Sequence, residues 1–87
     1  MRKILVVDDE KNIRESLQAL LEDEGFKVLS AVDGETAFKL LKRSIIDAVL
    51  LDVKLPGIDG IEVLKYIIQE FKLPPPVIMI SGHSNIE

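Results

Sequence analysis

Three uninterrupted apolar runs constrain the fold of this 87-residue chain more than any other feature of its sequence. They occupy residues 4–7, 48–51 and 77–80. Each run is aliphatic and lacks the polar alternation of a half-exposed strand, which is typical of a strand buried on both faces. Such strands occur in parallel sheets that are covered by helices on both sides. The runs therefore predict an α/β fold.

The segments between the runs favour helices and one further strand. Residues 11–22 place apolar side chains at helical spacing with polar ones between them, which predicts an amphipathic helix. A second short helix is predicted around residues 37–41, after a turn at Asp33 and Gly34, and a third over residues 61–71. The mixed run 26–31, which follows a helix cap at Gly25, is predicted to be an edge strand. This alternation predicts a doubly wound parallel sheet.

The last apolar run has an unusual position. Residues 77–80 carry no polar side chain, although no further strand follows them in the sequence. An open apolar edge favours pairing with another chain. We therefore expect a domain, residues 1–87, that is incomplete at its C-terminus and that can self-associate through this strand.

Acidic residues follow two of the runs. Asp8 and Asp9 come directly after the first run, and Asp52 comes after the run 48–51. The carboxyl ends of neighbouring parallel strands meet at one edge of a sheet, so these side chains should share a pocket. Carboxylates about 4 Å apart repel by roughly 4 kcal/mol per pair at an effective dielectric constant of 20, whereas a divalent cation reverses this effect. Oxygen ligands without Cys favour Mg²⁺ over zinc.

A carboxylate beside a metal ion can act as a nucleophile toward a phosphoryl donor. Asp52 stands alone at its strand end and is the candidate nucleophile, while Asp8 and Asp9 are the candidate metal ligands. The alternative for each residue is an aspartate that caps a helix or begins a turn. That alternative explains one such residue more easily than all three.

Ser81 follows the third run and should lie beside the same pocket, where its hydroxyl could donate to a phosphoryl oxygen. The segment Gly82-His83-Ser84 also resembles the nucleophile elbow of serine hydrolases. That interpretation fails because Ile86 replaces the second glycine and the chain has no other His. His83 is interpreted as a loop residue that lines the pocket.

Composition excludes several classes of function. The absence of Cys excludes disulfides and thiol catalysis, and a net charge of −4 argues against direct nucleic-acid binding. No apolar stretch approaches the roughly 18 residues of a membrane span. The apolar stretch that follows Arg2 and Lys3 ends at Asp8, too early for a signal peptide. We expect a cytoplasmic protein without a membrane segment.

Segments 4–10, 51–60 and 78–84 together resemble the receiver domains of bacterial two-component response regulators, and the resemblance covers the whole chain. The resemblance depends on the acidic pair, on the later aspartate with its Pro-Gly-x-Asp-Gly loop, and on the hydroxyl residue after a further strand. It implies a flavodoxin-like receiver fold with strand order 2-1-3-4, without the fifth strand and helix of the family.

The resemblance also implies roles for individual residues. Asp52 would accept a phosphoryl group from a cognate sensor histidine kinase, and Ser81 would be the switch hydroxyl. Mg²⁺ would be held by Asp8, Asp9, Asp52 and the backbone carbonyl of Lys54. Lys54 and the segment 82–84 are most similar to receivers of nitrogen-regulation activators, which are joined to a sigma-54-type ATPase domain and a DNA-binding domain. The expected function is a phosphoacceptor module that switches a transcriptional output and is not itself an enzyme.

Lys54 excludes one alternative, and a second alternative remains open. A phosphohydrolase of the haloacid-dehalogenase type also uses a strand-end aspartate and Mg²⁺, but it needs an acidic residue at the position of Lys54. A degenerate receiver would keep the fold and act through protein interaction or dimerisation, without phosphorylation. The second alternative is suggested by the absence of the lysine that binds the phosphoryl group in the family, a position that Lys42 and Lys54 do not match.

Overall fold

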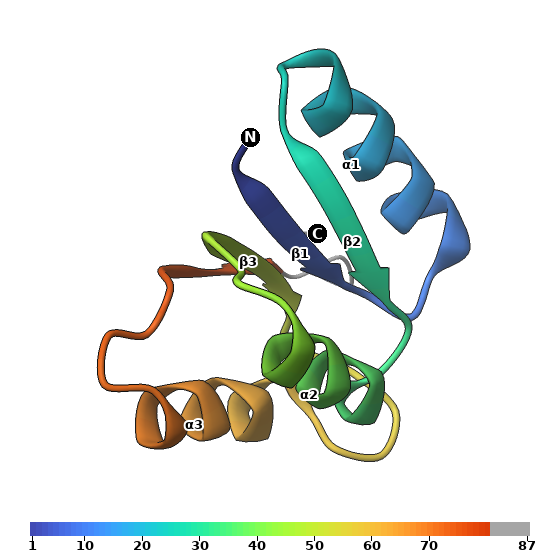
Figure 1. The fold of residues 1–87 in the computed structure, drawn as a ribbon. Coiled ribbons are helices and arrows are strands. Elements are labelled where there is room, and N and C mark those ends of the chain that lie inside the picture. The colour runs from blue at the N-terminus through green and yellow to red at the C-terminus, as the bar shows by residue number, and fades with distance from the viewer. Residues whose placement is uncertain (81–87) are drawn as a thin grey trace.

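The computed structural model describes residues 1–80. Strands and helices alternate strictly along them, as predicted (Figure 1). The elements in chain order are β1 Lys3–Val7, α1 Lys11–Asp23, β2 Lys27–Ala31, α2 Gly34–Arg43, β3 Ala48–Asp52, α3 Gly60–Glu70 and β4 Val77–Ile80. No helix of this part of the chain combines the length and apolar composition that crossing a membrane requires.

The strands form one parallel sheet in the order β2-β1-β3-β4, which confirms the predicted order. Val7 at the end of β1 pairs with Ala31 of β2 on one side and with Leu51 of β3 on the other. The carboxyl ends of these three strands are therefore level. Residues that follow β1 and residues that end β3 lie at the same edge of the sheet.

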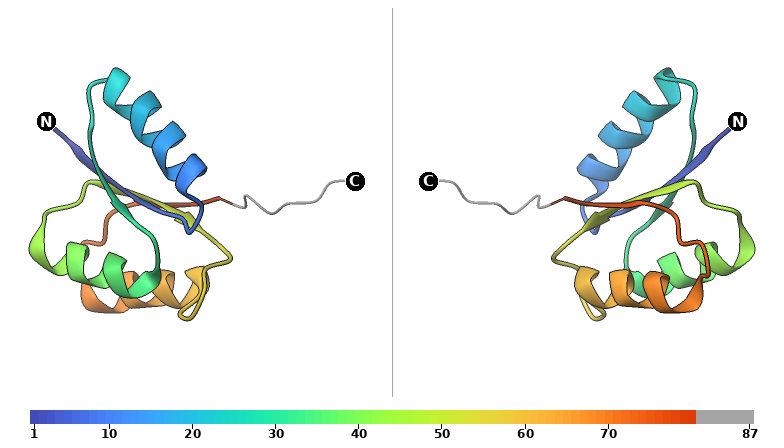
Figure 2. Two further views of the ribbon diagram at one scale, coloured as in Figure 1. Left: turned by 90° about the vertical axis from the view of Figure 1, so that its right-hand side faces the viewer. Right: turned by 90° about the vertical axis from the view of Figure 1, so that its left-hand side faces the viewer.

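Helices cover both faces of the sheet, with α1 on one face and α2 and α3 on the other (Figures 1 and 2). Successive residues of β1 alternate between two apolar clusters: Leu5 and Val7 pack toward α2 and α3, while Ile4 and Val6 pack toward α1. Leu5, Val6 and Val7 are completely buried. The prediction of a strand covered on both faces is thus confirmed for β1.

The two outer strands differ. Within residues 1–80, β2 pairs with β1 alone, as predicted for an edge strand, and it exposes the polar side chains of Lys27 and Ser30. β4 pairs with β3 alone among the described residues, and the side chain of Ile78 is 55% exposed. An apolar edge at the last strand, which the sequence predicted, is therefore present in residues 1–80.

The starts of the helices correct one prediction. Asp33 and Gly34 do not form a separate turn, because Gly34 is the first residue of α2 and Asp33 is its N-cap. The Asp33 side chain accepts a hydrogen bond from the Thr36 backbone N–H at 2.9 Å. Aspartate favours both turns and N-caps, and the helical segment that follows decides for the cap. Just after the C-terminal end of α1, Gly25 has φ 97°, as expected for a glycine that ends a helix.

Candidate metal centre

Three carboxylates meet at the carboxyl ends of β1 and β3. Asp8 follows β1 directly, Asp9 is the next residue, and Asp52 is the last residue of β3. Each offers an oxygen atom, and these atoms all lie within 4.8 Å of one another. Asp8 and Asp52 are completely buried, whereas Asp9 is exposed. The predicted meeting of the three side chains is therefore observed.

Local hydrogen bonds orient the two buried carboxylates. Asp8 Oδ1 accepts from the Glu10 backbone N–H at 2.9 Å, and Asp52 Oδ1 accepts from the Lys54 backbone N–H at 3.2 Å. The turn-forming role that was the alternative is thus observed for Asp8 and Asp52. Asp8 Oδ2 is buried and has no hydrogen-bond partner within residues 1–80. A buried acceptor without a partner is costly, and a cation would supply the missing partner.

The electrostatics of the cluster favour a cation. Burial raises the pKa of Asp8, and the hydrogen bond from the Glu10 backbone N–H opposes this effect. The negative charges of Asp52, Asp9 and Glu10 raise the pKa of Asp8 further. The ionised cluster is therefore disfavoured by itself, and a bound cation would stabilise it. Oxygen ligands alone suit Mg²⁺, so the residues present fit the predicted ion.

A family model described as the response regulator receiver domain matches residues 4–87. The chain belongs to this receiver family. Its membership confirms the resemblance seen in the sequence, and it places the acidic cluster in a family of signalling modules.

Relatives of this receiver include longer regulators. An NtrX-like response regulator of Rickettsia bellii is 43% identical over 86 residues, which cover 97% of this chain and 18% of the relative. The alkaline phosphatase synthesis transcriptional regulatory protein PhoP of Bacillus subtilis is 48% identical over 81 residues, which cover 93% of this chain and 33% of PhoP. The receiver thus spans a third or less of the length of these curated relatives.

Solved structures confirm the fold of the receiver. The response regulator protein TrrA in complex with the histidine kinase ThkA has a TM-score of 0.86 and 41% identity, and the match covers 98% of this chain and 72% of that one. TrrA from Thermotoga maritima in complex with Mg²⁺-BeF has a TM-score of 0.81 and 33% identity, and the match covers 95% of this chain and 90% of that one.

Other predicted site residues of the receiver have different outcomes. The Lys54 backbone N–H contacts Asp52, while metal binding by the Lys54 carbonyl stays a prediction. Ser81 and His83 lie outside the described residues. Arg14, a polar residue of α1 that the sequence did not single out, donates from Nη1 to the Asp8 backbone carbonyl at 3.0 Å. A single sequence offers no signal that separates such a contact from ordinary surface exposure.

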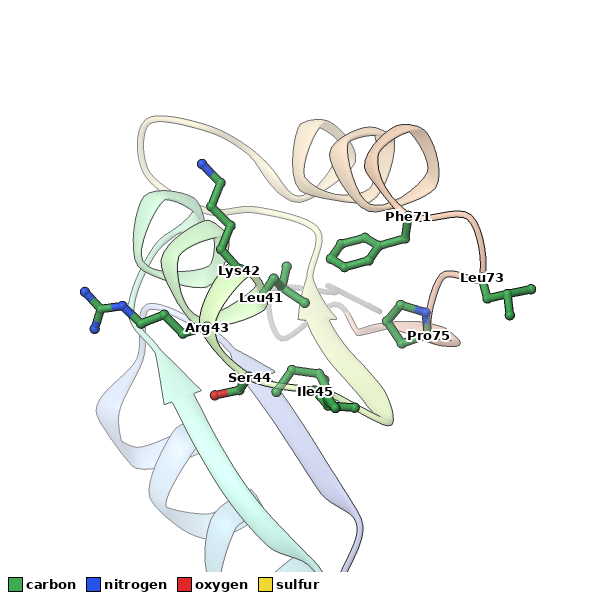
Figure 3. Close-up of a pocket in the computed structure, with 9 residues that line it drawn as sticks. Leu41, Lys42, Arg43, Ser44, Ile45, Phe71, Leu73 and Pro75 are labelled. Carbon is green, nitrogen blue, oxygen red and sulfur yellow. The ribbon is translucent and has the colours of Figure 1, made fainter.

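The receiver has an apolar hollow of about 370 Å³ at the opposite edge of the sheet (Figure 3). It is formed where the chain enters β3 and β4, and its lining residues include Leu41, Phe71 and Pro75. No carboxylate lines it, and Figure 3 shows the Arg43 side chain pointing away from it. The hollow and the acidic cluster are therefore separate features.

Proposed function

We propose that this receiver accepts a phosphoryl group on Asp52 from a phosphorylated histidine of a sensor kinase, with Mg²⁺ bound beside it. The observation that carries the proposal is the carboxylate cluster, in which the oxygen atoms of Asp8, Asp9 and Asp52 lie within 4.8 Å of one another. Two findings on TrrA support it, since that protein has been solved with a histidine kinase and with Mg²⁺-BeF.

Each residue of the site has its own proposed role. The carboxylates of Asp8, Asp9 and Asp52, with the Lys54 carbonyl, would hold Mg²⁺. When bound, the ion would offset the charge of the carboxylates and of the phosphoryl oxygens. An Asp52 carboxylate oxygen attacks phosphorus, so that an O–P bond forms while the P–N bond to the kinase histidine breaks and the imidazole leaves. The Ser81 hydroxyl would contact the transferred group as the switch.

The proposed output is transcriptional. PhoP is named as a transcriptional regulatory protein, and this receiver covers only 33% of its length. The NtrX-like relative is longer still, since the receiver covers 18% of it. We therefore propose that the receiver works with separate output domains, a sigma-54-type ATPase and a DNA-binding domain, and that it contacts no nucleic acid itself.

Acetyl phosphate and intact-mass spectrometry test the proposal. The wild-type chain with Mg²⁺ should gain the mass of one phosphoryl group, and Asp52→Asn should gain none. Asp59→Asn is the matched control, because Asp59 caps α3 and lies outside the carboxylate cluster. The Asp59→Asn variant should gain the same mass as the wild type, and removal of Mg²⁺ with EDTA should abolish the gain in both. An equal gain in wild type and Asp52→Asn would rule out Asp52 as the acceptor.

A second candidate function is self-association through β4, and it is favoured by one observation. β4 is wholly apolar, pairs with β3 alone among the described residues, and leaves Ile78 55% exposed. Light scattering should show concentration-dependent association of the wild type and less association of Ile78→Lys. A strictly monomeric wild type at every concentration would refute this function.

A further inference from the structure

Gly60 packs against the backbone of the strand end that carries Asp52. It is buried and is the first residue of α3. A Cβ atom placed at position 60 would overlap the Asp52 carbonyl oxygen and would lie 2.9 Å from both Cα and the carbonyl oxygen of Val53. These neighbours are backbone atoms, which cannot rotate away as a side chain can. Any side chain at position 60 must therefore separate α3 from β3.

A hydrogen bond joins the same two segments. The Gly60 backbone N–H donates to the Val53 carbonyl at 3.0 Å. The start of α3 is held in place by a capping box, in which the Asp59 carboxylate accepts from the Glu62 N–H at 3.0 Å and the Glu62 carboxylate accepts from the Asp59 N–H at 3.3 Å. The first turn of α3 is thus fixed directly against the Asp52–Val53 backbone.

Position 60 requires glycine because there is no room for a Cβ atom, and not because of the backbone conformation. Among the described residues, the glycines with positive φ are Gly25 and Gly57, so φ at Gly60 is open to any L-amino acid. Alanine would ordinarily be favoured over glycine in a helix. Contact with the Asp52 peptide reverses that preference here.

We propose that Gly60 is a positioning residue for the metal centre of this receiver. The close packing that it permits sets the place of the Asp52 peptide, and with it the Asp52 carboxylate and the Lys54 peptide that donates to that carboxylate at 3.2 Å. A displacement of this peptide moves two of the groups proposed to bind Mg²⁺ away from Asp8 and Asp9. The proposal rests on the proposed function, because it requires the cluster to bind Mg²⁺.

Gly34 offers a matched control in the same molecule. It is also buried and is the first residue of α2. A Cβ atom at position 34 would meet side-chain atoms only, 3.0 Å from Val63 Cγ2 and 3.1 Å from Ile58 Cβ. The substitution to alanine is therefore the same at both positions, but only at position 60 does it press on the backbone that carries Asp52.

The test is titration of the ¹⁵N-labelled 87-residue chain with MgCl₂, followed by NMR. Gly60→Ala should bind Mg²⁺ at least about tenfold more weakly than the wild type, the size of effect seen when groups that orient metal ligands are disturbed. Gly34→Ala should bind Mg²⁺ as the wild type does. A folded Gly60→Ala that binds Mg²⁺ with wild-type affinity overturns the proposal.

A measurement on the wild type keeps the proposal testable if Gly60→Ala does not fold. Mg²⁺ should move the amide resonances of Val53 and Gly60 together with that of Asp52, and leave the amide of Gly34 in place. A Gly60 resonance that stays fixed at saturating Mg²⁺ overturns the positioning role alone. A wild-type chain that binds no Mg²⁺ overturns the proposed function as well, so the two failures are distinguishable.

Discussion

Asp8→Asn is expected to stabilise this receiver when Mg²⁺ is absent. The ligand atoms of Asp8 and Asp52 lie within 4.8 Å of each other, a separation at which two unit charges repel by about 3.5 kcal/mol at an effective dielectric constant of 20. The amide keeps the oxygen that accepts the Glu10 N–H, and it adds a donor that can face Asp52. Burial and the neighbouring negative charges raise the pKa of Asp8, so the fold favours a neutral group at this position, and we expect the amide to add about 1–2 kcal/mol to the free energy of unfolding.

Urea unfolding followed by circular dichroism at neutral pH, with EDTA present, measures this gain. Asp23→Asn is the control, because Asp23 is exposed and outside the cluster; it should change the free energy of unfolding by no more than about 0.5 kcal/mol. In an Asp52→Asn background the gain from Asp8→Asn should shrink, because the partner charge is no longer there.

Mg²⁺ should reverse the ranking of the two proteins. At one hundred times its dissociation constant, a ligand that binds only the folded state adds about 2.7 kcal/mol to the free energy of unfolding, which exceeds the gain expected from Asp8→Asn. The wild type should show this increase, and Asp8→Asn should lose most of it. The reasoning is refuted if Asp8→Asn is less stable than the wild type in EDTA, or if both proteins gain equally from Mg²⁺.

Three further substitutions test the surrounding structure, each by urea unfolding. Leu51→Ala removes a completely buried side chain and should cost about 2–5 kcal/mol; a loss well under 1 kcal/mol would contradict the described core. Gly25→Ala should cost about 1–2 kcal/mol because φ is 97° there and no atom lies within 4 Å of the added Cβ; an unchanged free energy of unfolding would contradict that conformation. The hydrogen bonds from Thr36 lower the pKa of Asp33. The charged form of Asp33 therefore stabilises the folded protein at every pH above the unfolded-state pKa of about 3.9. This stabilisation is lost as the pH falls through the lower pKa of the folded state. The wild type should therefore exceed Asp33→Asn in stability at pH 7 and lose that advantage at low pH; a difference that is the same at both pH values would show that the charge of Asp33 contributes nothing to the cap.

The order of the strands and the meeting of the aspartates could be predicted from the sequence because both follow from periodicity and topology. Apolar runs without polar alternation specify buried parallel strands, and parallel strands bring Asp8 and Asp52 to one edge. Helix starts were less predictable. Aspartate is favoured both in turns and at helix N-caps, so the sequence alone does not decide between these roles for Asp33. The hydrogen bond from the Thr36 backbone N–H identifies Asp33 as an N-cap.

Two features of the site depend on distances that no sequence pattern carries. Arg14 reaches the Asp8 carbonyl from α1 because the helix lies close to the end of β1 in space. Gly60 resembles any glycine in a loop until the packing shows the Asp52 carbonyl against its Cα. The roles of Ser81 and of the Lys54 carbonyl remain predictions from the resemblance.

The two edges of the sheet differ in how readily they can pair with a further strand. β2 exposes Lys27 and Ser30 on its strand, and a charged side chain on an edge discourages the approach of another strand. β4 carries no charge to oppose such an approach. A further strand, whether from the same protein or from another molecule, therefore has one side on which to add. A label attached at Ser30 should leave that addition undisturbed, which makes the β2 side the place for a reporter of assembly.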